Sequence, residues 1–198
     1  QVGVPVRDLL GQPRRDSIPL AFASGALPAE MVASDVVDAF ESGFRTFKIK
    51  VTSDLDSSAA RINAITRELS DRADPDEVFV RADANTGWES YERAVDAIDR
   101  IDRQEFIEYY EQPVATDAVG DLRSLRTVKG VPVFADEAIH DAAEVRELTR
   151  EPAAVSGFCA KLAKAGSLVE IIRMGELAAD AGLPVTLVSA FETSLGVA

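Results

Sequence analysis

The feature of this sequence that most constrains its fold is a repeat, in which a short apolar segment is followed by a longer segment with helical spacing at least six times. The short segments are rich in β-branched or aromatic residues, and most are bounded by Gly, Pro, Asp or Ser, which predicts strands. Seven segments have this character: Ile18–Ala23, Thr46–Val51, Val78–Ala82, Phe106–Glu111, Val131–Asp136, Val155–Lys161 and Val185–Ser189. The repeat therefore predicts an α/β fold of parallel strands joined by crossover helices.

The segments between the strands place apolar residues three or four positions apart, as amphipathic helices do. The predicted helices cover Ala29–Glu41, Ser58–Leu69, Tyr91–Ile101, Ala118–Val128, Ala142–Leu148 and Ser167–Ala181. We also expect Val2–Gly11 to be the end of a helix packed before the first strand.

Two architectures fit this order, an open doubly wound sheet and a closed (β/α) barrel. At least five successive strands end in charged residues, which favours the barrel because all strand ends of a barrel point at one mouth. A complete barrel usually has eight strands and about 250 residues. We therefore expect residues 1–198 to be one barrel domain, with its eighth strand missing, that belongs to a longer chain and is not stable and active alone.

The formal net charge of -13 argues against a protein that binds nucleic acid or an anionic membrane surface, since both need a basic face. No apolar stretch approaches the roughly 18 residues of a membrane span. A single cysteine, Cys159, excludes an intrachain disulfide framework and fits a cytoplasmic protein. The chain has 16 Arg but only 5 Lys, a balance that fits either a halophilic surface or an ordinary acidic protein.

The few lysines lie at informative positions. Alternation along the second strand places Lys48 and Lys50 on one face, unless this is an edge strand with a solvated face. Neighbouring ammonium groups and desolvation both disfavour the charged form, so one lysine can act as a base near neutral pH. Lys161 ends the sixth strand, with Cys159 one step deeper in a packing role, whereas Lys164 has either a surface or a supporting role.

Three carboxylates end the third, fourth and fifth strands. Asp83, Glu111 and Asp136 are 28 and 25 residues apart, about one strand–helix unit each, so they reach the same mouth. Converging carboxylates repel one another unless a cation neutralises them. An all-oxygen set suits Mg²⁺ better than zinc, although each residue alone could simply cap a helix. Arg81 shares the face of Asp83.

Lysines on both sides of a metal site suit removal of a proton α to a carboxylate, because the metal takes up charge as the carboxylate becomes an enediolate. Two other classes stay open. A non-catalytic barrel would use the carboxylates for a structural cation, and a Schiff-base aldolase would use Lys161 without a metal. The lone histidine, His140, is expected in a loop.

The Lys-x-Lys, Asp-x-Asn, Glu-Gln-Pro, Asp-Glu and Lys motifs, in this order, resemble the enolase superfamily and, within it, the muconate lactonizing enzyme subgroup. The resemblance runs from Leu9-Leu10-Gly11 to Glu192-Thr193-Ser194-Leu195-Gly196. It implies a barrel capped by an α+β domain that these residues do not include. It also implies that Mg²⁺, or alternatively Mn²⁺, is bound by Asp83, Glu111 and Asp136. By the same resemblance Lys50 is the acid/base residue, Lys48 is its supporting neighbour, and Lys161 lies across the substrate.

Within the subgroup, the segments Lys161–Ser167 and Ser189–Gly196 most resemble o-succinylbenzoate synthases of menaquinone synthesis. That resemblance implies elimination of water from a small cyclic carboxylate. Muconate cycloisomerases and dipeptide epimerases use the same constellation and remain alternatives. Residues expected to contact the substrate or to support the site are Arg81, Asn85, Glu137 and Ser189. A homo-oligomer is compatible with this picture.

Overall fold

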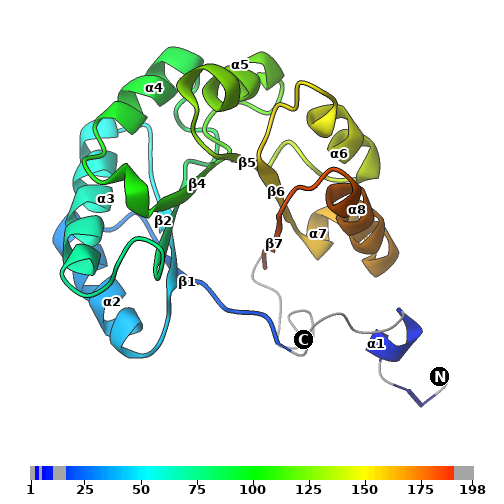
Figure 1. Cartoon of the computed structure of the whole chain (residues 1–198), viewed down its shortest axis with the longest axis horizontal. Coiled ribbons are helices and arrows are strands. Elements are labelled where there is room, and N and C mark those ends of the chain that lie inside the picture. The colour runs from blue at the N-terminus through cyan, green and yellow to red at the C-terminus, as the bar shows by residue number, and fades with distance from the viewer. Residues whose placement is uncertain (1–2, 5, 11–16, 190–198) are drawn as a thin grey trace.

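In the computed structural model, which describes residues 3–4, 6–10 and 17–189, seven parallel strands form one sheet in the order β1 to β7. Each strand pairs with the next one along the chain, and the sheet curls into an arc with the helices on its outer side (Figure 1). The strands are β1 (Phe22–Ser24), β2 (Thr46–Lys50), β3 (Phe79–Asp83), β4 (Ile107–Glu111), β5 (Val133–Ala135), β6 (Gly157–Ala160) and β7 (Val185–Leu187). All seven predicted strands are confirmed, the largest change being that β1 begins at Phe22 rather than Ile18.

The six predicted helices are also present. They are α2 (Ala29–Glu41), α3 (Leu55–Ser70), α4 (Tyr91–Asp99), α5 (Val119–Ser124), α6 (Ala142–Thr149) and α8 (Leu168–Asp180). The segment predicted as one helix over Ala118–Val128 is α5 followed by a π-helical turn, η2 (Leu125–Lys129), which ends at left-handed Gly130. A 3₁₀ turn, η1 (Gln104–Phe106), precedes β4.

Two one-turn helices complete the set, α1 (Val6–Leu9) and α7 (Leu162–Ala165). The sequence pattern did not predict α7, because a single turn is too short to show a helical period. The side chains of Val6 and Leu9 are 57% and 63% exposed, so the expectation of a packed N-terminal helix is wrong for the described residues. The remainder of Val2–Gly11 lies partly outside those residues.

The main core lies between the sheet and its outer helices. Outward-facing strand residues such as Phe47, Ile49 and Phe158 are fully buried against apolar faces of the helices. Trp88, which precedes α4, is buried next to Tyr110, with ring centroids 5.8 Å apart, so it packs in this core. Burial of this apolar surface is the main favourable term in folding. It fixes which face of each strand looks inward.

Polar side chains fix the starts of four helices, α3, α4, α6 and α8. An oxygen of the residue before each helix accepts a hydrogen bond from a free backbone N–H of the first turn, which stabilises that end. The capping residues are Asp54 for α3, Ser90 for α4, Asp141 for α6 and Ser167 for α8.

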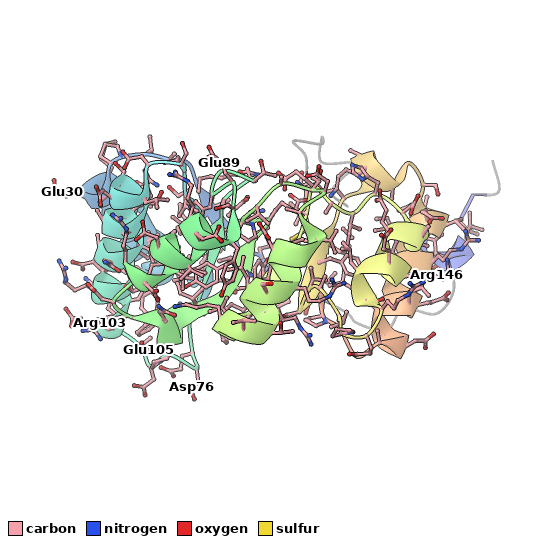
Figure 2. All side chains as sticks on the ribbon, turned by 90° about the horizontal axis from the view of Figure 1, so that it is seen from above. Glu30, Asp76, Glu89, Arg103, Glu105 and Arg146 are labelled. Atoms are coloured by element: carbon pink, nitrogen blue, oxygen red, sulfur yellow. The ribbon has the colours of Figure 1, made fainter. Side chains whose placement is uncertain are left out.

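All strands run the same way, so their carboxyl ends share one edge of the arc. Figure 2 shows the two ends of the molecule: Glu30 and Glu89 lie at the end where the strands finish, while Asp76 and Glu105, which precede β3 and β4, lie at the other. No described helix is long and apolar enough to cross a membrane. The carboxyl-end edge is where ligand sites of barrels lie.

Candidate functional site

Strands β2 to β6 carry charged residues at their carboxyl ends on the inner face of the arc. Lys48 and Lys50 alternate with fully buried Phe47 and Ile49, which face the helices. The two lysines therefore share the inner face, as predicted. Strand β2 pairs with both β1 and β3, which excludes the alternative of a solvated edge strand.

The register sets the first part of the site. Lys50 lies beside Asp83, and Asp83 beside Glu111, across three adjacent strands. The Nζ atom of Lys48 is 2.6 Å from Glu111 Oε1 and 3.0 Å from Asp83 Oδ2, and Lys50 Nζ is 2.6 Å from Asp83 Oδ2. Both carboxylates are fully buried. Their charges are thus balanced by lysines from the neighbouring strand.

Asp136, directly after β5, forms the second part. Its buried carboxylate accepts a hydrogen bond from Lys161 Nζ at Oδ2 and another, of 2.7 Å, from Lys164 Nζ at Oδ1. Lys161 follows β6 and begins the unpredicted turn α7, whose hydrogen bond from Lys164 N to Lys161 O brings the two lysines together. Sequence reasoning left the role of Lys164 open, and the signal that could have placed it is its three-residue spacing from Lys161.

The supporting residues are brought together only in part. The side chain of Asn85 accepts a hydrogen bond from Lys50 Nζ and donates one of 2.8 Å to Glu137 Oε1, so it links β2, β3 and β5. Ser189 is exposed, two residues beyond β7. The tail motif from Ala190 to Gly196 lies outside the described residues.

Arg81 is held by β4. Its Nε donates a 2.6 Å hydrogen bond to Glu108 Oε2, and its guanidinium lies 5.1 Å from the centre of the Tyr109 ring. The pairing of β3 with β4 skips Glu108, because a bulge shifts the register between Val80 and Arg81. This extra residue supplies the carboxylate that Arg81 needs, and none of the described hydrogen bonds of Arg81 goes to Lys50.

Burial and charge shift the pKa values of this cluster. Burial, followed by the charge of Asp83, raises the pKa of Glu111 to about 7 even though Lys48 opposes the shift. Burial alone would lower the pKa of Lys48, but the charges of Glu111 and Asp83 outweigh it and hold that pKa above the usual value.

The same balance operates at Asp136. Burial disfavours its charged form, yet hydrogen bonds from Lys161 and Lys164 keep its pKa below the ordinary value, and that of Lys161 is raised in turn. The expectation that a neighbouring ammonium group and desolvation depress a lysine pKa on β2 is therefore wrong for Lys48. At both Lys48 and Lys161, nearby carboxylates outweigh the desolvation of the ammonium group.

The three carboxylates supply the oxygen ligands that a divalent cation such as Mg²⁺ prefers. All three are buried oxygen donors on adjacent strands, and Glu111 Oε2 is buried without a hydrogen-bond partner in the described part of the chain. With lysines on each carboxylate, no group of three or more His, Cys, Asp and Glu residues within the described ranges lies in an arrangement that could hold a metal ion. A hard cation would give Glu111 Oε2 a partner. It would also offset the burial and the charge of Asp83, which together raise the pKa of Glu111.

Two further residues, Cys159 and His140, are of types that can act as a nucleophile or as a metal ligand. Cys159 is fully buried, and burial raises its pKa well above the usual value, so it packs rather than reacts, as expected. His140 is exposed in the loop after β5, with Nδ1 3.1 Å from Glu144 Oε2. Neither residue joins the cluster of lysines and carboxylates described above.

Comparison with known proteins gives a consistent result. The chain is 34% identical over 186 residues to o-succinylbenzoate synthase of Mycolicibacterium smegmatis, covering 92% of the chain and 53% of that protein. It is 30% identical over 196 residues to L-Ala-D/L-Glu epimerase of Bacillus subtilis, covering 98% of the chain and 52% of that protein. The chain thus spans about half the length of the curated relatives it matches.

A solved structure agrees in fold. The crystal structure of the dipeptide epimerase from Methylococcus capsulatus, complexed with Mg and the dipeptide L-Arg-D-Lys, superposes with a TM-score of 0.85 at 26% identity. The match covers 99% of this chain and 53% of that chain. The curled sheet described above is therefore the barrel architecture predicted from the strand ends.

The model of one protein family, the enolase C-terminal domain-like family, matches residues 31–198. That range includes every lysine and carboxylate of the cluster. From the match and the relatives together, this chain belongs to the enolase C-terminal domain-like family of the enolase superfamily.

Proposed function

We propose that the protein containing this chain is a Mg²⁺-dependent enzyme that removes the proton α to a substrate carboxylate. The observation that supports this is the order of charges along the arc. Lysines of β2 stand at one end of a buried row formed by Asp83, Glu111 and Asp136, and Lys161 stands at the other. A site built only for a structural cation has no use for amines at both ends.

Asp83, Glu111 and Asp136 would hold the metal ion. When bound, Mg²⁺ supplies electrostatic stabilisation of the negative charge that develops on the substrate carboxylate as the α-proton leaves. The residues of the chain do the rest: they bind the substrate, exclude water and move the proton.

Lys50 is the residue we assign to proton transfer. Its side chain is 40% exposed, compared with 15% for Lys48, so it is the lysine of β2 that can reach a substrate in the mouth. Lys48, bound to both Glu111 and Asp83, supports the position of those carboxylates. Lys161 lies across the substrate, where its ammonium group would stabilise developing negative charge.

The reaction we favour is the elimination of water that o-succinylbenzoate synthases carry out, because such a synthase is among the most similar relatives. In that reaction Lys50 takes the α-proton and then delivers it to the departing hydroxide, so Lys50 ends the reaction in its starting protonation state. Racemisation or epimerisation of an amino acid derivative is the second candidate, favoured by the relative of Bacillus subtilis. There Lys50 and Lys161 would exchange the α-proton on opposite faces.

The wider setting follows from the same assignment. We propose that residues 1–198 contribute the barrel domain, that a capping α+β domain elsewhere in the protein helps to select a small carboxylate substrate, and that the protein is cytoplasmic. Arg81, Asn85, Glu137 and Ser189 are the residues we assign to support of the site or contact with the substrate.

The test uses the full-length protein with and without Mg²⁺. Formation of o-succinylbenzoate, followed by its ultraviolet absorbance, supports the elimination. Deuterium exchange at the α-carbon of L-Ala-L-Glu or N-succinyl-Arg in D₂O without elimination supports the epimerase alternative. Chelation should abolish either activity. Activity that survives chelation and is blocked by borohydride trapping at Lys161 would instead favour an aldolase and contradict the proposal.

A further inference from the structure

Gln112, the residue that follows Glu111, makes hydrogen bonds through both the oxygen and the nitrogen of its side-chain amide. Its side chain is fully buried. The Oε1 atom accepts hydrogen bonds from the backbone N–H groups of Asp136 (3.0 Å) and Ala138 (3.1 Å), and Nε2 donates one to Val114 O (3.0 Å). Three backbone groups after β4 and β5 are therefore fixed by one amide.

The backbone of Gln112 joins the same strand ends. Its N–H donates to Phe134 O on β5 (2.8 Å), and its carbonyl accepts from Thr86 N after β3 (2.7 Å). The φ angle of Gln112 is +36°, a left-handed conformation that disfavours residues with a Cβ atom. Glycine would fit this backbone more easily, so the presence of a glutamine points to a use for its side chain.

The location of this amide suggests that use. Glu111 is bonded directly to Gln112, and the backbone N–H of Asp136 donates a hydrogen bond to Gln112 Oε1, so this one residue joins the backbones that carry two of the carboxylates. We propose that Gln112 is a positioning residue, which sets the separation of the Glu111 and Asp136 carboxylates and thereby the affinity of the site for Mg²⁺. This inference depends on the proposed function, since it assumes that these carboxylates bind the metal.

A purely structural role would look the same in a stability measurement, so a matched control is needed. Asn63 on α3 supplies one, because its Nδ2 donates to Arg100 O (2.9 Å) and its Oδ1 accepts from Asp102 N (3.0 Å). It is also an amide that joins two elements through backbone groups. Its partners follow α4 and precede β4, away from the carboxyl ends of the strands.

The experiment compares Gln112→Met, Gln112→Asn and Asn63→Leu in the full-length protein. Methionine keeps the length of the side chain but removes the amide, and asparagine keeps the amide but is one methylene shorter. Two quantities are measured: the Mg²⁺ dissociation constant by titration calorimetry, and the hydrogen-exchange rates of the Asp136 and Ala138 amides in metal-free protein. Thermal melting shows which variants fold.

We expect both Gln112 variants to bind Mg²⁺ about 10- to 100-fold more weakly, the range typical when an outer partner of a metal ligand is removed. The Asp136 and Ala138 amides should also exchange faster. Asn63→Leu should lower the melting temperature without changing either quantity. A Gln112 variant that folds and keeps wild-type affinity and exchange would overturn the inference, and the asparagine variant decides the matter if the methionine variant does not fold.

The inference and the proposed function fail in different ways. A wild-type protein that binds no Mg²⁺ contradicts the proposed function, and with it the claim about affinity. A wild-type protein that binds Mg²⁺, together with Gln112 variants that match it, leaves the proposed function intact and removes only the role of Gln112.

Discussion

The inner face of the arc consists of two layers that lie two residues apart on the same strands, and the layers differ sharply. From β2 to β6, the layer at the mouth contains only charged residues: Lys50, Asp83, Glu111, Asp136 and Lys161. The layer below it contains Lys48, Arg81, Tyr109, Phe134 and Cys159. From β2 to β6 the lower layer changes from charged to aromatic and then to a thiol.

The contacts differ in the same way. Within the mouth layer, Lys50 forms an ion pair with Asp83 and Lys161 with Asp136, and Lys48 of the lower layer forms one with Glu111 above it. In the lower layer the rings of Tyr109 and Phe134 stack at 3.8 Å and 3°, and Cys159 packs beside them. Burial keeps the pKa values of Tyr109 and Cys159 raised, so both stay neutral. The neutral part of the lower layer, Tyr109, Phe134 and Cys159, which we call the floor, excludes water and strengthens the electrostatic interactions above it. The comparison therefore assigns chemistry to the mouth and support to the floor.

The largest effect that tests this assignment comes from the lysines of the mouth. Lys50→Ala in the full-length protein should lower kcat by about 10²- to 10⁴-fold, the usual contribution of a general acid–base group, while the substrate still binds. Lys161→Ala should also be severely impaired. Steady-state kinetics measure the loss, with Cys159→Ala in the floor as the control. Equal losses in Lys50→Ala and Cys159→Ala would remove the distinction between the layers.

The next effect concerns the metal. Glu111→Gln keeps the shape of the side chain but removes the charge, so Mg²⁺ binding should weaken at least about 10-fold and activity should fall with it. Calorimetric titration of the full-length protein with Mg²⁺ measures the change. Asp83→Asn and Asp136→Asn should behave alike. Undiminished Mg²⁺ binding in any of the three would exclude that residue from the ligand set.

The mouth layer was largely predictable from the sequence, because period-two alternation and recurrence at about one strand–helix unit place charges without knowledge of packing. The same signals could not describe contacts that depend on strand pairing or on short turns. The bulge that brings Glu108 to Arg81 depends on strand pairing, which no local pattern reports. The contact of Lys164 with Asp136 depends on a one-turn helix. For the same reason the pKa direction of Lys48 was misjudged, since it depends on carboxylates from other strands.

A third effect tests the floor through stability. Phe134→Ala removes the ring that stacks on Tyr109 and leaves a cavity in a buried layer, so we expect a loss of about 3–5 kcal/mol in the free energy of unfolding. Urea denaturation of the full-length protein measures it, and Phe134→Leu should lose less because it leaves a smaller cavity. Variants with unchanged unfolding free energies would contradict the supporting role of the floor.

The smallest effect separates packing from hydrogen bonding within the floor. The hydroxyl of Tyr109 donates a 3.3 Å hydrogen bond to Thr186 Oγ1 on β7 and lies 4.0 Å from Cys159 Sγ. Tyr109→Phe removes this bond while the stack on Phe134 remains, so the free energy of unfolding should fall by only about 0.5–1.5 kcal/mol.

Thr186→Val should lose a similar amount, and the double variant should lose less than the sum of the two, because both single changes break the same bond. If the floor only supports, kcat of Tyr109→Phe should stay within about twofold of wild type, since no group that moves a proton has changed. A loss of kcat that approaches the loss in Lys50→Ala would mean that the Tyr109 hydroxyl takes part in the chemistry. The residues that carry the chemistry would then include one from the lower layer, two positions deeper along the strand than the mouth layer.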